Sequence, residues 1–506
     1  MRRNIVLTSR RPANVRRNPA AVSLTLLPRE VLDAAAYIRS LGPAVKTNLV
    51  GGAVVDMIQG TPPKDHDIEV YGIEPDALAA GLARKFKVSE VGKAFGVLKV
   101  RLASGEDLDV SQPRRDNRTG VGHKGFSVSV DPFMSFTDAA RRRDFTINAI
   151  SVDLASGAVI DPFNGVKDLQ EGVLRAVDPV TFVEDPLRAL RAVQLLARKA
   201  KTVDLSTKRL IRDLVPAQAD LPAERVFEEW RKLLLKGKRP SVGLELMNET
   251  GLLDAYPELA ATRGVPQRGD AHPEGDVWEH TKQTTDIAAS LRDRLPPEKR
   301  EALMFAALLH DVGKSSPGIT VYEDDIRSGK FPEDRLHTAY GHDAAGEPMA
   351  QAFLDRMRAP KALSKAVARL VKEHMQPLQM GSGGAKSAAY DRLARKLEEG
   401  GADMDTLLYL TMSDSGGRTP GGADTTEGHL ANLILEDSAR RLGEHIEAMK
   451  SRPAALTPLV QGRDLIALGI KPGPTFKPLL DFALSLQDEG LEKDEIIRRV
   501  LERARG

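Results

Sequence analysis

The hydrophobic and polar positions of the first 165 residues predict short strands that alternate with helices. An apolar stretch, Asn48–Val50, ends at two glycines, and Ala53–Ile58 continues with helical spacing. Apolar and polar residues then alternate from Asp65 to Val70, as they do in a strand with one buried face. A helix is expected over 75–86 and another alternating strand over 96–102. This part of the chain is therefore expected to be an α+β region.

Helical spacing dominates the rest of the chain. Amphipathic helices are predicted after Pro186, through Ala223–Leu235, and again from Leu430 onward. Between them, Arg263–Gly275 is rich in glycine, proline and charge, which is typical of a linker. These changes of pattern divide the chain into five segments, with boundaries at 1–29, 30–165, 166–262, 263–425 and 426–506.

Composition narrows the classes of protein to which this chain can belong. The 506 residues carry 73 Lys and Arg against 71 Asp and Glu, so a nucleic-acid partner must be bound by local basic patches. Cysteine is absent, which excludes disulfides and thiolate metal sites and fits a reducing cytosol. No apolar run approaches ~18 residues, so we expect no membrane-spanning helix. The chain is predicted to be cytoplasmic.

Residues 1–29 contain seven arginines and no acidic residue. This composition favours a flexible basic arm that contacts RNA phosphates. An organelle-targeting segment is the alternative, whereas a secretory signal is excluded because the segment has no apolar core.

Asp65 and Asp67 carry the first candidate chemistry. Because strand side chains alternate, residues i and i+2 point the same way, and these two carboxylates are expected to converge. Paired carboxylate oxygens are ligands that suit Mg²⁺. Gly51 and Gly52, just before a predicted helix, leave the backbone open to a polyphosphate.

Two-metal phosphoryl transfer needs a further carboxylate near such a pair. Asp107 and Asp109 share one face of a later predicted strand. Asp109 is the preferred candidate because Leu108 and Val110 flank it, with Asp107 as the alternative. A hairpin charge that faces water is the competing interpretation.

The stretch from Leu49 to Gly72 resembles the head-domain signature of the nucleotidyltransferase superfamily that includes DNA polymerase β. More narrowly, it resembles the class II tRNA nucleotidyltransferases, which are CCA-adding enzymes, and the bacterial poly(A) polymerases. These families usually read Gly-Gly-Ala-Val-Arg-Asp, whereas Val55 stands at the Arg position here. One expected triphosphate contact is therefore missing.

The run Arg141–Ile150 resembles the second motif of the same family. The resemblance implies that Arg143, Asp144 and Asn148 bind the nucleotide at its triphosphate and ribose, with Arg143 the best phosphate ligand. The basic, glycine-rich segment Ser111–Met134 is similar to the mobile loop of the gamma-proteobacterial CCA-adding enzymes. We expect it to close over a triphosphate or an RNA end, and a surface loop without that role is the alternative.

The helix predicted after Pro186 begins next to Asp185 and carries Arg188 and Arg191 one turn apart. Cytosine and adenine each present an exocyclic amine beside a ring-nitrogen acceptor, so an Asp that accepts and an Arg that donates would admit both bases. Glu-Asp-x-x-Arg is the motif with which class II enzymes choose nucleotides, and the resemblance assigns this role to Asp185 and Arg188. Arg191 is expected to help hold the nucleotide. A helix cap with an ion pair is the alternative.

Histidines gather beyond the predicted linker. His and Asp are the natural ligands of a divalent transition metal in a chain without cysteine. The adjacent His310 and Asp311 follow an apolar helix, where unpaired polar groups would be costly. The order His, His-Asp, Asp resembles the HD phosphohydrolases, which implies a metal site made by His280, His310, Asp311 and Asp414. His342 and His374 are candidates for a second ion or for phosphate, and buried structural histidines are the alternative.

The resemblance covers the chain from Asn48 onward. It implies a polymerase-β-like mixed-sheet head at 30–165, a helical neck and body at 166–262, an all-α HD domain at 263–425 and a helical C-terminal RNA-binding region at 426–506. The implied activity is Mg²⁺-dependent addition of CCA to tRNA from CTP and ATP without a nucleic-acid template, beside an HD phosphohydrolase activity. Poly(A) polymerases, enzymes that add only CC or only A, and a phosphohydrolase with a non-catalytic RNA-binding head are the alternatives.

Overall fold

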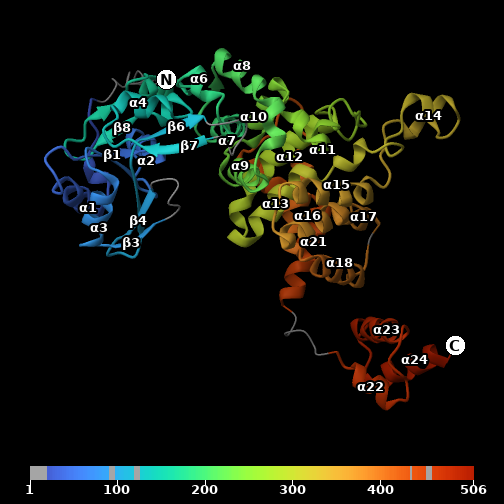
Figure 1. The fold of residues 1–506 in the computed structure, drawn as a ribbon. Coiled ribbons are helices and arrows are strands. Elements are labelled where there is room, and N and C mark those ends of the chain that lie inside the picture. Colours follow the sequence, from blue (N-terminus) through green and yellow to red (C-terminus); the bar gives the residue numbers. More distant parts are fainter. Residues whose placement is uncertain are drawn as a thin grey trace, which may run out of the picture. The chain divides into compact units, whose positions relative to one another are not determined.

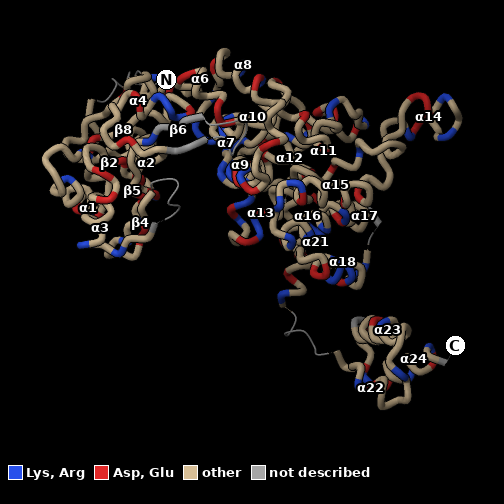
Figure 2. The backbone as a smooth tube through the Cα atoms, in the orientation of Figure 1, with Lys and Arg blue, Asp and Glu red and all other residues tan. Residues whose placement is uncertain are grey.

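The computed structural model describes residues 20–90, 97–118, 126–383, 385–433, 436–451 and 458–505 (Figure 1). The chain forms two compact units, one made of Met1–Pro222 with Leu246–Leu252 and the other of Ala223–Glu245 with Leu253–Gly506. No helix among the described residues is long and apolar enough to cross a membrane. Basic and acidic residues are interspersed along the backbone of both units, in keeping with the balanced composition (Figure 2).

A mixed sheet forms the centre of the first unit, with the strand order β3-β4-β5-β2-β1-β8-β9. Strands β2 and β5 pair in parallel, whereas the other neighbours in this sheet pair antiparallel. The strands are β1 (Lys46–Val50), β2 (Asp67–Tyr71), β3 (Lys87–Glu90), β4 (Val97–Arg101), β5 (Asp107–Ser111), β8 (Ser151–Asp153) and β9 (Val159–Ile160). The predicted mixed-sheet head is confirmed.

One face of this sheet carries the hydrophobic core. Ile68 and Val70 of β2 and Leu108 and Val110 of β5 are fully buried. They join apolar residues of the helices that cover this face, which are α1 (Arg29–Arg39), α2 (Gly52–Ile58) and α3 (Pro75–Ala83). Because strand side chains alternate, residues 67, 69, 109 and 111 lie on the opposite face of the sheet. The core therefore fixes which side chains are left for chemistry.

Part of the segment predicted to be a mobile loop forms a two-stranded sheet. Strand β6 (Arg114–Arg118) pairs antiparallel with β7 (Phe126–Val130). Residues 119–125 between the two strands, with the three glycines on which the prediction rests, lie outside the described residues, as do residues 1–19 of the predicted basic arm. The sequence suggested a loop because polar and basic residues outnumber apolar ones in this stretch.

Short helices follow the sheet in the first unit. They are α4 (Phe136–Arg141), α5 (Gly165–Glu171), α6 (Pro179–Phe182), α7 (Leu187–Lys199) and α8 (Leu205–Asp213), with the small parallel pair β10 (Val173–Leu174) and β11 (Thr202–Val203). Helix α7 is strongly amphipathic, and its apolar side, from Leu187 to Ala197, is buried.

The second unit is helical. Its longer helices include α9 (Ala223–Lys236), α12 (Val277–Leu291), α13 (Pro297–Leu309), α15 (His342–Arg356), α16 (Lys361–Glu373), α18 (Ser387–Gly400), α19 (Met404–Gly416) and α21 (Asp437–Lys450). Helices α12, α13, α16 and α19 pack against one another in the pairs α12–α13, α12–α19, α13–α16 and α13–α19. The predicted all-helical HD region is confirmed.

The last described helices are α22 (Gly462–Ala467), α23 (Phe476–Asp488) and α24 (Lys493–Arg505). They bury an apolar cluster of their own, which includes Leu465, Leu479, Ile496 and Val500. This agrees with the predicted helical C-terminal region. The five predicted domain boundaries stay predictions.

Candidate functional site

Two carboxylates face each other across neighbouring strands of the head sheet. Asp67 on β2 pairs directly with Asp109 on β5 in the parallel ladder, and both are half-buried. Asp65 is exposed and lies in the bend before β2, because the strand begins at Asp67 rather than at Asp65. Asp107, the alternative candidate, is exposed and forms an ion pair with Arg101 at 2.6 Å.

Negative charge accumulates at the Asp67–Asp109 pair. Burial is the main cause that raises the pKa of Asp67, and the neighbouring Asp109 carboxylate adds to it, whereas Arg143 acts in the opposite direction. The Oδ1 atom of Asp109 is buried without a hydrogen-bond partner in the described structure, and Lys99 Nζ lies 3.5 Å away. An unsatisfied carboxylate oxygen beside a second carboxylate suits a hard divalent cation, so this donor set fits Mg²⁺.

The glycine turn lies against the same carboxylates. Gly51 has a φ of 75°, and a Cβ at this position would lie 3.2 Å from Asp67 Oδ2. Gly52 begins α2, is exposed, and would have no atom within 4 Å of an added Cβ. Val55 in the same helix is completely buried. The turn therefore leaves open backbone beside Asp67, while the position of the family arginine is part of the protein interior.

A cavity of about 290 Å³ continues along this face of the sheet beyond the carboxylates. Glu69 and Ser111, each two residues after Asp67 and Asp109, are among the residues that line it. Arg143 also lines the cavity, where its Nη2 lies 3.4 Å from Glu69 Oε1. Gln112 and Arg114, which belong to the segment expected to close over a triphosphate, and Arg142 are further polar residues of the wall.

Asp144 lies at the centre of a buried network. It accepts hydrogen bonds from Arg191 Nε at 2.6 Å and from Asn148 Nδ2 at 3.0 Å. Burial by itself would raise the pKa of Asp144, but Arg191 and the Asn148 hydrogen bond outweigh it, and the pKa is lowered. The fold therefore brings the second motif and α7 together, as the prediction requires.

Asp185 and Arg188 lie at the start of α7. The Leu187 N–H donates to Asp185 Oδ1 at 3.1 Å, so Asp185 satisfies the first N–H of the helix, while Pro186 occupies the N-cap position. Arg188 donates from Nη1 to the Thr181 carbonyl at 2.6 Å and from Nη2 to the Arg142 carbonyl at 2.7 Å. These bonds to the main chain hold the guanidinium in one place, and its burial lowers the pKa of Arg188.

The second unit brings together all four predicted ligands of the HD centre. His280 Nε2 lies 3.0 Å from Asp414 Oδ1 and 3.2 Å from His310 Nε2, and His310 Nε2 lies 3.3 Å from Asp311 Oδ2. His280, His310 and Asp311 are almost completely buried. Burial would raise the pKa of Asp311, but His310 and Lys314 hold it well below the usual range.

The two further histidines lie on the other side of Asp311. Its Oδ1 lies 3.3 Å from His342 Nε2 and 3.7 Å from His374 Nε2, and these two nitrogens are 3.2 Å apart. Asp311 therefore offers Oδ2 to one group, with His280 and His310, and Oδ1 to another, with His342 and His374.

The protonation of these histidines favours metal binding. The Nδ1 atoms of His310, His342 and His374 each lie within hydrogen-bond distance of a main-chain carbonyl three residues earlier, at 3.0, 2.6 and 2.6 Å. A carbonyl can only accept, so each Nδ1 carries a hydrogen, and in the neutral ring each Nε2 presents a lone pair to the centre. Lone pairs that face each other at 3.2 Å repel unless a cation lies between them, so the residues fit one or two metal ions.

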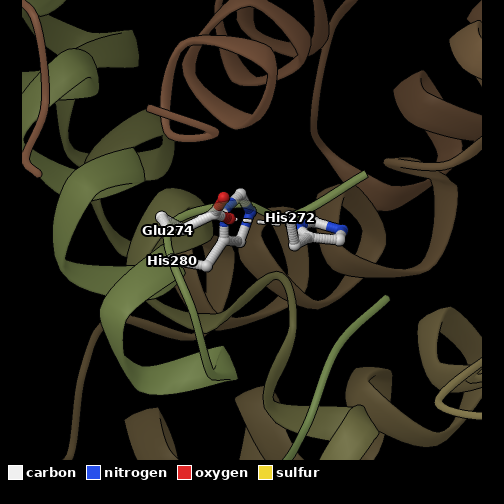
Figure 3. Close-up of side chains that lie close together, drawn as sticks. All are labelled: His272, Glu274 and His280. Carbon is white, nitrogen blue, oxygen red and sulfur yellow. Dashed lines mark hydrogen bonds and ion pairs between the residues drawn. The ribbon is translucent and has the colours of Figure 1, made fainter. Parts of the chain in front are cut away.

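Two residues from the predicted linker also belong to this centre. Glu274 lies between His280 and His272 (Figure 3). A cavity of about 270 Å³ opens beside them, and its wall includes His272, Lys314 and His342. The available signal was the spacing His272-x-Glu274 six residues before His280, in a stretch whose glycine and proline content was taken as that of a linker.

Three family models match successive parts of the chain. A model described as the poly A polymerase head domain matches residues 47–175, one described as a probable RNA and SrmB-binding site of polymerase A matches 202–262, and the HD domain model matches 277–409.

Curated relatives match over most of their length. A multifunctional CCA protein of Xanthomonas campestris pv. campestris is 37% identical over 338 residues, which cover 65% of this chain and 75% of the relative. A protein of the same description from Neisseria meningitidis is 36% identical over 379 residues, which cover 74% of this chain and 83% of the relative.

Solved structures share the fold. The Bacillus stearothermophilus CCA-adding enzyme in complex with CTP has a TM-score of 0.63 at 22% identity, covering 94% of this chain and 97% of that one. The Thermotoga maritima CCA-adding enzyme complexed with tRNA has a TM-score of 0.56 at 19% identity, covering 96% and 98%.

Proposed function

This chain belongs to the family of the multifunctional CCA proteins, and from that membership we propose that it adds CCA to the 3′ end of tRNA from CTP and ATP without a nucleic-acid template. The observation that supports the chemistry is the register of the head sheet, which sets Asp67 opposite Asp109 beside the open glycine turn. Because the substrate is tRNA, we place the activity in the cytoplasm.

The reaction joins the RNA 3′ oxygen to the α-phosphorus of the nucleotide and releases pyrophosphate. Mg²⁺ held by Asp65, Asp67 and Asp109 would neutralise phosphate charge and lower the pKa of the attacking hydroxyl. Gly51 and Gly52 offer main-chain N–H groups and space for the triphosphate. Catalysis then depends chiefly on position and charge.

The remaining binding residues divide between phosphate and base. Arg143, on the wall of the cavity beside the carboxylates, is proposed to contact phosphate. Arg191, tied to Asp144, is proposed to hold the nucleotide together with Asn148. Asp185 and Arg188 are proposed to select cytosine and adenine, and the two main-chain bonds of Arg188 support this because they fix the guanidinium before a nucleotide binds.

Addition of single nucleotides tests this proposal. Labelled CTP, ATP, GTP and UTP are supplied separately and together to a tRNA transcript that lacks CCA, and product length is resolved on a gel. Three added nucleotides, C before A, with GTP and UTP inert, are expected. Long A tracts would identify a poly(A) polymerase, and CC or A alone would identify an enzyme of partial activity. No addition over a range of Mg²⁺ concentrations would leave only the phosphohydrolase.

We also propose a metal-dependent phosphohydrolase activity for the HD centre, because its histidines face one another with lone pairs. A divalent transition metal there would activate water for attack on phosphorus. Lys314 and Arg418, which bind Asp311 and Asp414 at 2.7 and 3.0 Å, keep these carboxylates ionised. Hydrolysis of a chromogenic phosphomonoester and of a cyclic phosphodiester, with Mn²⁺, Ni²⁺, Co²⁺ or Mg²⁺, is the test. No turnover with any of these ions would refute it.

A further inference from the structure

Glu274 connects two histidines through one oxygen atom. Its side chain is completely buried, and Oε1 lies 2.7 Å from Nδ1 of His280 and 2.9 Å from Nδ1 of His272 (Figure 3). The other oxygen, Oε2, is buried and has no hydrogen-bond partner in the described part of the chain. A buried carboxylate is costly, so its retention at this point calls for a specific role.

The contact places a carboxylate at Nδ1 of His280, whose Nε2 lies 3.0 Å from Asp414 Oδ1 and 3.2 Å from His310 Nε2. To bind a metal, Nε2 must be free of hydrogen, and the hydrogen of the neutral ring is then held on Nδ1 beside Glu274, because a carboxylate only accepts. The other three histidines of the centre, His310, His342 and His374, gain the same arrangement from main-chain carbonyls. His280 instead depends on a side chain from the loop before α12. This makes its orientation sensitive to a single substitution.

The same oxygen acts on His272. With its Nδ1 held by Glu274, the Nε2 of His272 is an acceptor on a ring that lines the 270 Å³ cavity beside Lys314 and His342. One carboxylate oxygen thus sets the tautomer of a histidine at the metal centre and of a histidine on the cavity wall. The state of the cavity wall is thereby coupled to the geometry of the centre.

A separate cation held by His272, Glu274 and His280 is the competing interpretation of these three side chains. It requires His280 to give up the hydrogens of both ring nitrogens, because its Nε2 already faces the other ligands. The Nδ1 atoms of His280 and His272 lie 2.7 and 2.9 Å from Glu274 Oε1, which are separations typical of hydrogen bonds. Two ligand atoms bound to the same tetrahedral metal lie farther apart than this. The geometry therefore favours direct contact.

We propose that Glu274 is a positioning residue of the HD metal centre, which orients His280 for the metal and His272 toward the phosphate-ester substrate. This inference rests on the proposed phosphohydrolase centre. Removal of such an outer carboxylate typically weakens metal binding about 10- to 100-fold. Gln keeps an acceptor of the same shape without the charge, and Ala keeps neither. The affinities are therefore expected to rank wild type above Glu274→Gln, and Glu274→Gln above Glu274→Ala.

The test is calorimetric titration of the metal-free, full-length protein with Mn²⁺. Asp270→Asn is the matched control, because Asp270 is an exposed carboxylate in the same loop that forms an ion pair with Arg268. We expect Asp270→Asn to bind like wild type, Glu274→Gln about 10-fold more weakly and Glu274→Ala about 100-fold more weakly. The metal-free melting temperature of each variant serves as a check that its second unit, which contains Glu274, is folded.

A second readout separates positioning from simple packing. The melting temperature of each protein is measured with and without Mn²⁺. A positioning role predicts that the metal-free melting temperature stays close to that of wild type while the increase on metal binding shrinks. The inference would be overturned if the Glu274 variants bound Mn²⁺ as tightly as wild type but had a lower metal-free melting temperature. It would also be overturned if wild type bound one Mn²⁺ ion more than Glu274→Ala and the affinity for the remaining ions were unchanged.

His310→Ala distinguishes this inference from the proposal on which it rests. If wild type binds Mn²⁺ and His310→Ala does not, the metal centre is established, and equal binding by the Glu274 variants then refutes the positioning role alone. If wild type itself does not bind any of Mn²⁺, Ni²⁺ or Co²⁺, the phosphohydrolase centre and this inference fail together.

Discussion

Restoring the family arginine at position 55 should destabilise the head and bring no gain in nucleotide binding. The Val55 side chain is completely buried in α2, the helix whose Val54 and Met57 enter the core of the sheet. Val55→Arg loses about 1.5–3 kcal/mol of apolar burial and adds about 1–3 kcal/mol of overpacking. The sum is about 2.5–6 kcal/mol, before any cost of desolvating the charge. This is a large part of the ~5–15 kcal/mol by which a domain is stable.

The assay must report on the head alone, because the chain has two compact units. CTP incorporation after short incubations at increasing temperature gives the inactivation midpoint of the head. At about 2–4 °C per kcal/mol, Val55→Arg should lower that midpoint by at least about 5 °C. Val180→Arg is the matched control, because Val180 lies in the same unit with 71% of its surface exposed and should change the midpoint by about 1 °C or less.

The KM for CTP supplies the other half of the test. If the arginine reached the triphosphate, KM would fall, since a charge-assisted contact is worth about 1.5–3 kcal/mol. The buried position of Val55 instead predicts an unchanged or higher KM at a temperature where the variant is folded. A variant with the midpoint of wild type and a lower KM for CTP would refute the reasoning and show that position 55 opens onto the nucleotide.

Three further outcomes follow from the two sites. Asp67→Asn should lower CCA addition by more than about a hundred-fold and leave phosphatase activity intact. His310→Ala should do the reverse when both activities are assayed on the same preparations. A variant that removed both activities would contradict separate sites. The pKa of Asp144 is lowered, so its contribution to stability is complete above its ordinary value of 3.8 and is lost as the pH falls through the lower folded value. Urea unfolding of wild type should therefore become easier below pH 3.8. An equal pH dependence in Asp144→Asn would disprove this. Gly313→Ala would place a Cβ 1.9 Å from the His342 carbonyl oxygen. We expect a loss of about 1–3 kcal/mol in unfolding free energy together with weaker Mn²⁺ binding. A variant indistinguishable from wild type in both measurements would contradict the close packing.

Local sequence patterns predicted which residues belong to the head site better than they predicted which of these residues lie opposite each other. Alternation was sufficient to place Asp67 and Asp109 on the polar faces of their strands, because Ile68, Leu108 and Val110 are apolar neighbours. It could not predict that these aspartates stand opposite each other. Their strands are separated by β3 and β4 in the sequence and pair in parallel, which is a long-range property.

The HD centre shows a different limit. The order of its histidines in the sequence was enough to predict the ligands, and the fold brings them together. Glu274 was missed because its segment has the composition of a linker, and composition does not reveal that one side chain of a loop is completely buried. A histidine in the first turn of a helix needs an acceptor for Nδ1, and this requirement was the physical reason to search the preceding loop.

The register of β2 and β5 links the position of Asp109 in the head site to the burial of its neighbours in the core. A shift of β5 by one residue would turn Asp109 into the core and bring Leu108 and Val110, both completely buried, to the solvent side. Losing the burial of these two side chains costs about 3–6 kcal/mol, so the shifted register is strongly disfavoured against the native one. A change of length in the turn before β5 is therefore expected to be absorbed within the turn, which leaves Asp109 opposite Asp67.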